Sequence, residues 1–211
     1  MDHSILHLSI RHRAGSVQHY YHFLMGFLVP LVERMSREGS SDFSAVRIRS
    51  CGPMDAHIAA LGYPQVRLFP KGVHRRMRDD AQSGSANSIV VEEARGYDFP
   101  TVYDADLFVR VAAMIKQRVT PDLAAAANTN TAGKTVLVRR ATHPFYASPK
   151  SEIKHSGADR RSIANFDQVE EAVRAVYPDL ITVELEQMTF AAQIRLFHDA
   201  GLVIAQHGAA L

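Results

Sequence analysis

Residues 181–211 read ITVELEQMTFAAQIRLFHDAGLVIAQHGAAL. Apolar and polar residues alternate over 181–185, which predicts a strand. Over 190–197 the apolar residues recur at helical spacing, and residues 202–205 form a fully apolar run that is typical of a buried strand. The order strand, helix, strand predicts two parallel strands joined by a right-handed crossover.

The same pattern extends upstream. Residues 135–139 are a short apolar run, and the apolar residues of 169–176 recur at positions i, i+3, i+4 and i+7 of a helix. Thr189 can cap the start of the following helix, and Gly201 can cap its end. This β-α-β-α-β order predicts an α/β domain with a parallel sheet. Ligands of such sheets bind beyond the carboxyl ends of the strands, here at residues 206–211.

Only three strands of this domain precede Leu211. A doubly wound domain usually has about five or six, so we expect the C-terminal domain to be incomplete. An apolar strand at the edge of such a sheet favours association. The chain is therefore expected to self-associate or to need a partner that completes the sheet.

The N-terminal part also has an α/β pattern. Residues 20–35 are apolar on nearly every side, which predicts a buried helix despite Gly26 and Pro30. The further expected elements are strands at 45–50, 66–69 and 89–92 and helices at 54–61 and 103–118.

The composition changes abruptly to small and polar residues at 124–133, AAAANTNTAG. Such a change is typical of a connection between domains, so we expect an N-terminal α/β domain at residues 1–130 and a partial C-terminal Rossmann-like domain at residues 131–211. A frayed helix end and a surface loop within one domain fit these residues equally well.

The overall composition excludes several classes of protein. With 46% hydrophobic and 22% charged residues the chain is an ordinary globular protein. A net charge of +2 and 8% aromatic residues without Trp argue against nucleic acid as a partner. The single cysteine, Cys51, cannot form an internal disulfide, and no Cys/His spacing resembles a zinc site, which fits a reducing compartment. The apolar residues 23–32 are too few for a membrane span and no secretory signal is recognisable, so we expect a cytoplasmic protein; peripheral membrane contact stays open.

Several segments resemble one family. Residues 189–211 resemble the signature of glycosyltransferase family 61, in which a Gln-containing helix leads to a strand and a His-Gly-Ala-Gly-Leu turn. Residues 160–165, RRSIAN, are similar to its Arg-Arg-x-Ile-x-Asn element, and residues 20–24, YYHFL, to its Tyr-Tyr-His-Trp-Leu element. Residues 136–139 fit its strand that ends in Arg.

The resemblance implies a GT-B type fold of two facing Rossmann-like domains, with the acceptor on the N-terminal side and the nucleotide sugar on the C-terminal side. It implies an inverting transfer from a nucleotide-sugar donor to a glycan acceptor, without a cofactor or a bound metal. Bacterial members are often associated with capsular or other surface polysaccharides. The chain departs from the family at Gly26, where an acidic residue is common, and after Leu211, where the family continues.

Such a transfer needs N–H donors or cations for the leaving diphosphate. Gly208 and Ala209 offer backbone N–H groups that a phosphate can approach closely, and His207 can contact the donor or orient this turn. The guanidinium groups of Arg160 and Arg161 match phosphate oxygens in geometry and stay charged.

Three weaker donor-site candidates follow from the same residues. Arg139 ends its strand within a basic stretch, residues 134–161, that holds seven Lys/Arg against two acidic residues; a solvated loop is the alternative. Asn165 is most simply an N-cap with Gln168 three residues later. Gln193 is expected on the polar side of its helix, exposed to solvent or bonded to the His207 turn.

The acceptor hydroxyl needs a base, and His22 is the best candidate because its unperturbed pKa lies near neutrality. A core histidine that is simply hydrogen-bonded fits position 22 about as well. Asp104 and Asp106 are alternative carboxylates. The basic cluster 71–78 either binds an anionic acceptor or a membrane surface, or is a solvated loop.

Two other functions stay open. Gly26 and the missing C-terminal strands favour a catalytically inactive fragment or a binding and assembly domain of glycosyltransferase ancestry. A sugar-nucleotide epimerase of similar architecture is the weaker alternative.

Overall fold

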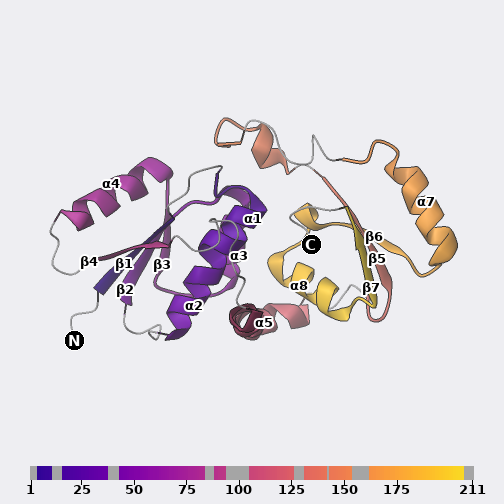
Figure 1. The fold of residues 1–211 in the computed structure, drawn as a ribbon, viewed down its shortest axis with the longest axis horizontal. Helices are drawn as coiled ribbons and strands as arrows, with labels where there is room; N and C mark the ends of the chain where they lie inside the picture. Colours follow the sequence, from indigo (N-terminus) through magenta and orange to yellow (C-terminus); the bar gives the residue numbers. More distant parts are fainter. Residues whose placement is uncertain are drawn as a thin grey trace. The chain divides into compact units, whose positions relative to one another are not determined.

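The computed structural model describes residues 4–10, 16–37, 43–83, 88–93, 105–125, 131–141, 143–153 and 162–206. The chain forms two compact units, Met1–Arg118 and Val119–Leu211. Each unit contains a parallel sheet with helices (Figure 1). This mixed architecture fits a Rossmann-like α/β fold, as the sequence predicts.

The N-terminal sheet has four parallel strands in the order β3-β2-β1-β4. Their bounds are β1 Ser4–Ile10, β2 Phe43–Arg49, β3 Val66–Phe69 and β4 Ser88–Glu93. β1 was not among the expected strands, although it lies at the centre of this sheet. Its Leu6 and His7 are both fully buried, so the two faces of the strand are covered.

One long helical run follows β1. It consists of α1 (Tyr20–Phe23), the π-helical segment η1 (Leu24–Leu28) and α2 (Val29–Arg37). Its apolar side chains form much of the core of this unit, as the sequence predicts: Phe23, Phe27, Leu28, Leu31 and Val32 are all fully buried. Gly26 lies within η1 rather than ending the helix.

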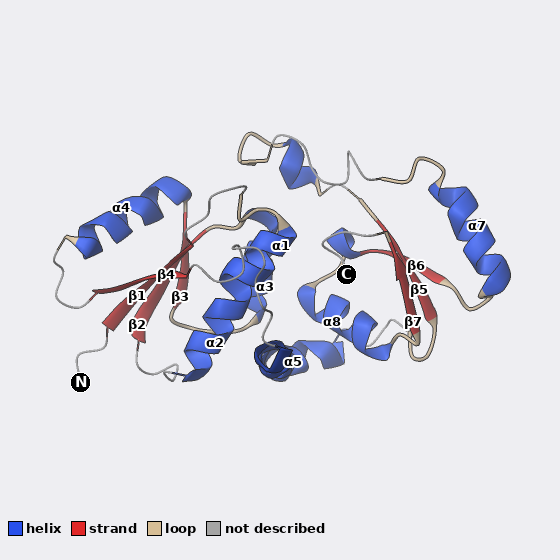
Figure 2. Cartoon of the chain, viewed as in Figure 1, coloured by secondary structure: helices blue, strands red, loops and turns tan. Residues whose placement is uncertain are grey.

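Further helices are α3 (Asp55–Ala60), which follows the short 3-10 turn η3 (Gly52–Met54), and α4 (Lys71–Gln82). The helix α5 (Ala105–Ala125) begins in this unit and continues past its end at Arg118. α4 lies on one side of the sheet and α1, α2 and α3 lie on the other (Figure 2). The solvated-loop alternative for residues 71–78 is wrong, because they are helical. Within α4, His74 is buried, and its Nε2 lies 3.1 Å from the carbonyl oxygen of Arg47. A loop of solvated residues does not predict this buried side chain.

The C-terminal sheet has three parallel strands in the order β6-β5-β7. They are β5 (Thr135–Arg139), β6 (Ile181–Glu184) and β7 (Leu202–Ala205), and the helices between them are α7 (Phe166–Val176) and α8 (Phe190–Asp199). The 3-10 turns η4 (Pro144–Ala147) and η5 (Leu185–Gln187) complete the unit. The predicted β-α-β-α-β order of this part is confirmed.

Alternate side chains of β5 build two cores in this unit. Val136 and Val138 pack with Leu196 of α8, whereas Leu137 packs with Phe166 of α7. α7 and α8 accordingly lie on opposite sides of the sheet (Figure 1). Because β5 is covered on both faces, its run of valine and leucine needs no polar alternation.

The caps of α8 match the sequence in part. Thr189 accepts a hydrogen bond from the N–H of Ala192 at 3.2 Å, as expected of an N-cap. Gly201 does not end the helix in a left-handed conformation, because the C-cap is Ala200 with extended backbone and Gly201 has no positive φ. The reason for a glycine there is its close approach to Gly133.

Candidate functional site

A pocket lies at the edge of the C-terminal sheet where the strands reach their carboxyl ends, which we call the carboxyl edge. The ends of β5 and β7 reach it, together with the segment that leads into α7. Its lining residues are Val138, Arg139, Arg140, Ser162, Ile163, Phe166 and Gln206. The topological rule for parallel sheets predicts a ligand site at this edge.

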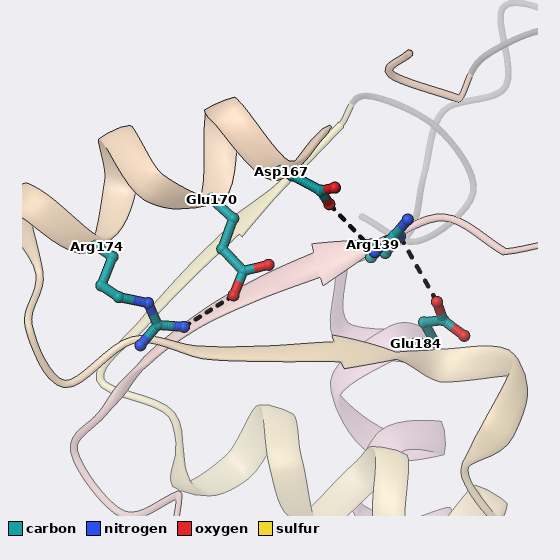
Figure 3. Close-up of polar contacts among 5 residues, drawn as sticks. All are labelled: Arg139, Asp167, Glu170, Arg174 and Glu184. Atoms are coloured by element: carbon teal, nitrogen blue, oxygen red, sulfur yellow. Dashed lines mark hydrogen bonds and ion pairs between the residues drawn. The ribbon is translucent and has the colours of Figure 1, made fainter. Parts of the chain in front are cut away.

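Arg139 is the last residue of β5 and its charge is balanced. Its Nη1 lies 3.6 Å from Oδ1 of Asp167 on α7, and its Nε lies 3.7 Å from Oε1 of Glu184 on β6 (Figure 3). The guanidinium carbon is 5.0 Å from the ring centre of Phe166, within reach of a cation–π interaction. Arg139 therefore lines the pocket and also ties the end of β5 to β6 and α7.

Arg140 follows directly and has different surroundings. Its Nη1 is buried and has no hydrogen-bond partner among the residues that the structure describes. The sequence counts Arg140 within the basic stretch but does not single it out. Two consecutive arginines cannot be told apart from the sequence. Only the packing shows that Arg139 has acidic partners and that the buried Nη1 of Arg140 has no acceptor among the described residues.

Two titratable groups have shifted pKa values in this part of the unit: Glu186, which interacts with the Arg140 charge, and Tyr146, which interacts with Glu186. Although Glu186 is exposed, the protein atoms that crowd its carboxyl group raise its pKa; N–H groups of Glu186 and Ala141 act in the opposite direction, as does the Arg140 charge. Burial raises the pKa of Tyr146 to about 12, and the Glu186 carboxylate adds to this shift. This region thus holds a cation, a carboxyl group of raised pKa and a neutral phenol.

Asn165 occupies the N-cap position of α7 but does not cap with its side chain. Its Nδ2 instead donates to Oε1 of Gln168 at 3.1 Å, and both side chains are exposed. The expected capping hydrogen bond is therefore not formed. The backbone carbonyl of Asn165 accepts from the N–H of Gln168 at 3.1 Å, which starts the helix.

Gln193 is buried, contrary to the expectation that it lies on the polar side of α8. Its Nε2 donates to the carbonyl oxygens of Leu185 at 2.9 Å and Met188 at 3.3 Å. These two carbonyls belong to the turn after β6, so Gln193 fixes the path of the chain just past the carboxyl end of that strand. The side chain of Gln193 thus has a structural role near the carboxyl edge.

Five predicted donor-site residues lie outside the described part of the chain: Arg160, Arg161, His207, Gly208 and Ala209. The described residues next to them are Ser162 and Gln206, and both line the pocket. The chain therefore leads from the pocket directly into the two segments that the sequence assigns to the donor.

His22, the predicted base, lies in α1 of the N-terminal unit. α1 follows β1, and the π-helical segment η1 begins two residues after His22; π-helical turns occur frequently at functional sites. His22 is half-buried, with its ring centre 5.6 Å from that of His19 and 5.9 Å from that of Tyr21. Both interpretations of His22, a base and a hydrogen-bonded histidine, stay predictions. Of the alternative carboxylates, Asp106 is exposed on α5 and Asp104 lies outside the described residues.

The sequence missed a polar turn at the carboxyl end of β2. The carboxylate of Asp55 accepts from the hydroxyl of Ser50 and from the N–H of Cys51, each at 2.6 Å. Gly52 follows with a φ of 69°, a conformation that glycine adopts without strain. A serine at the end of a strand with an aspartate five residues later was the available signal.

In the described ranges, no group of three or more His, Cys, Asp or Glu side chains is placed to hold a metal ion. None of the helices seen there has both the length and the apolar character needed to cross a bilayer.

Comparison with models of protein families gives a match. Residues 20–211 match the family model described as Glycosyltransferase 61. Neither the curated proteins nor the solved structures contain a match. The matched range includes the segment of His22 and the residues that line the pocket, and it covers most of the chain. The protein therefore belongs to glycosyltransferase family 61.

Proposed function

We propose that this glycosyltransferase moves a sugar from a nucleotide-sugar donor to a glycan acceptor, with inversion at the anomeric carbon and without a metal ion. The observation that carries the proposal is a pocket with two arginines at the carboxyl edge of a parallel sheet, in a chain of family 61. An enzyme that uses no metal needs protein cations and N–H groups to stabilise the leaving diphosphate.

The donor is proposed to bind at this pocket. Arg160, Arg161, His207, Gly208 and Ala209 are proposed to contact the diphosphate, because in the chain they lie directly next to the pocket residues Ser162 and Gln206. Arg139 is proposed to act on the donor through the structure of the pocket, because two carboxylates already balance its charge.

The acceptor is proposed to bind to the N-terminal unit beside His22. The imidazole takes the proton from the acceptor hydroxyl, the hydroxyl oxygen forms the new bond to the anomeric carbon, and the bond from that carbon to the diphosphate oxygen breaks. The nucleoside diphosphate leaves with both electrons of that bond. The ring cluster of His19, Tyr21 and His22 offers flat faces of the kind on which sugars can lie.

The two units, each with a parallel sheet, support a GT-B architecture for the whole enzyme. A role in surface or capsular polysaccharide synthesis is proposed from the family resemblance. The competing proposal, a binding or assembly domain without activity, rests on Gly26 in η1, where the family commonly carries an acidic residue.

Calorimetric titration with UDP and with GDP tests the donor site. We expect one of the two to bind, and we expect Arg161→Ala to weaken this binding by at least tenfold. Lys150→Ala is the matched control, because it removes an exposed charge from the same basic stretch. If neither nucleotide binds to the folded protein, the proposed donor site is wrong.

A further inference from the structure

Arg139 and Arg140 differ in the groups that lie near their guanidinium groups. Arg139 has carboxylates on two sides and an aromatic ring within cation–π distance. For Arg140 the described residues provide no acceptor to the buried Nη1. Of the two arginines that line the pocket, Arg140 is thus the one with an unused buried donor.

A buried guanidinium N–H without an acceptor is unfavourable, because it has left water without replacing the lost hydrogen bond. The group cannot lose its proton to avoid this cost, since arginine stays charged in proteins. The carboxyl group of Glu186, which interacts with the Arg140 charge, has hydrogen bonds of its own from the N–H groups of Ala141 and Glu186. An oxyanion that reaches this N–H group from the pocket that Arg140 lines would remove the cost.

The rest of the pocket suits such an anion. The hydroxyl group of Ser162 is exposed on its wall and can donate a hydrogen bond, whereas Ile163 and Phe166 provide apolar surface. Arginine binds phosphate oxygens in a planar, two-pronged geometry that lysine cannot reproduce. The pocket therefore combines one strong anion ligand with one neutral donor.

We propose that Arg140 binds the diphosphate of the donor directly, and that Arg139 is a positioning residue that holds the end of β5 between Asp167 and Glu184. The identity of the anion rests on the proposed function. The inference that the buried Nη1 of Arg140 binds an oxyanion rests on the structure alone.

The test combines binding and stability in three variants. Arg140→Met removes the charge and keeps much of the volume, and Arg140→Lys keeps the charge without the planar fork. Arg174→Met is the control, because Arg174 pairs with Glu170 at 2.8 Å on α7 and does not line the pocket (Figure 3). Each protein is titrated with inorganic pyrophosphate and with UDP and GDP, and its unfolding is followed in denaturant.

We expect Arg140→Met to weaken pyrophosphate and nucleotide binding at least tenfold without lowering the denaturant midpoint, because its side chain leaves no buried donor without an acceptor. Arg140→Lys should weaken binding by a smaller factor. Arg174→Met should lower the midpoint, because an ion pair and a hydrogen bond to the carbonyl of Leu180 are lost. Its binding should stay within about twofold of the unmodified protein.

The outcomes separate this inference from the proposed function. If nucleotide binds and neither Arg140 variant weakens it, the inference about Arg140 is wrong and the proposed function stands. If pyrophosphate binds through Arg140 and no nucleotide does, the anion site is supported and the donor proposal fails. A protein that binds none of the three ligands contradicts both. A fall in midpoint for Arg140→Met as large as that of Arg174→Met would assign Arg140 a structural partner in the chain and overturn the inference.

Discussion

The backbones of Gly133 and Gly201 approach each other so closely that a Cβ atom at position 201 would lie 2.5 Å from the carbonyl oxygen of Gly133. Two backbone hydrogen bonds hold the two segments together. The N–H of Gly133 donates to the backbone carbonyl oxygen of Asp199 at 2.8 Å, and the N–H of Gly201 donates to the backbone carbonyl oxygen of Lys134 at 2.9 Å. The contact joins the entry of β5 to the entry of β7. It therefore sets the alignment of two strands whose opposite ends line the pocket.

Gly201→Ala is expected to lower the free energy of unfolding by about 1–3 kcal/mol, because the new methyl group meets backbone atoms that cannot rotate away. Gly72→Ala is the matched control: position 72 lies in α4 with open space around it, and alanine favours a helix by roughly 0.5–1 kcal/mol over glycine. Urea unfolding measures both. Equal stability of the two variants would show that the backbones separate easily.

Gln193→Glu is expected to destabilise the protein by about 2–4 kcal/mol at pH 7.5, because a carboxylate would replace the donor that now faces two carbonyl oxygens. The new carboxyl group needs a proton to donate, so its pKa is raised in the folded state, and the loss should shrink as the pH falls towards 5. Gln168→Glu on the exposed face of α7 controls for the change of charge. A loss that does not depend on pH would contradict this account.

Because of His7, the free energy of unfolding should decrease as the pH falls. Burial, the charge of Arg47 and the neighbouring His74 together lower the pKa of His7 to about 4, and burial is the largest of these causes. The unfolded chain takes up this proton near pH 6.5, whereas the folded protein takes it up only near pH 4. Proton uptake therefore favours the unfolded state between these values, so the free energy of unfolding is highest above pH 6.5 and decreases as the pH falls towards 4.

His7→Leu tests this effect, because leucine needs no hydrogen bond and does not titrate. Between pH 7.5 and pH 5 the unmodified protein should lose on the order of 1–2 kcal/mol more stability than the variant. Denaturant midpoints at the two pH values give the difference. If both proteins lose the same amount, protonation of His7 does not control acid stability.

The sequence was most informative where one kind of residue fills a whole element. The middle of β5 (residues 136–138) and all of β7 are continuous apolar runs, and Thr189 caps α8 as predicted. β1 was missed because His7 interrupts its apolar pattern, and in the fold this buried histidine lies near His74 and Arg47, which come from distant parts of the chain. α4 was missed because charged side chains surround its narrow buried face at His74.

For the site, the order of strands was sufficient to place a pocket at the carboxyl edge of the C-terminal sheet. It could not separate Arg139 from Arg140, because their difference arises from Asp167, Glu184 and Phe166 on other elements. The burial of Gln193 depends on the turn after β6, whose path cannot be read from local spacing. Self-association stays a prediction, and light scattering would contradict it if the chain is monomeric at every concentration.

The most direct test of the proposed function is the release of nucleoside diphosphate from a panel of nucleotide sugars, with and without glycan acceptors. We predict release from at least one donor, faster with an acceptor, and at least a hundredfold slower in His22→Asn, since a positioned base contributes about 10²–10⁴-fold. Absence of release from every donor by the folded protein, or equal rates for the protein and His22→Asn, would contradict it.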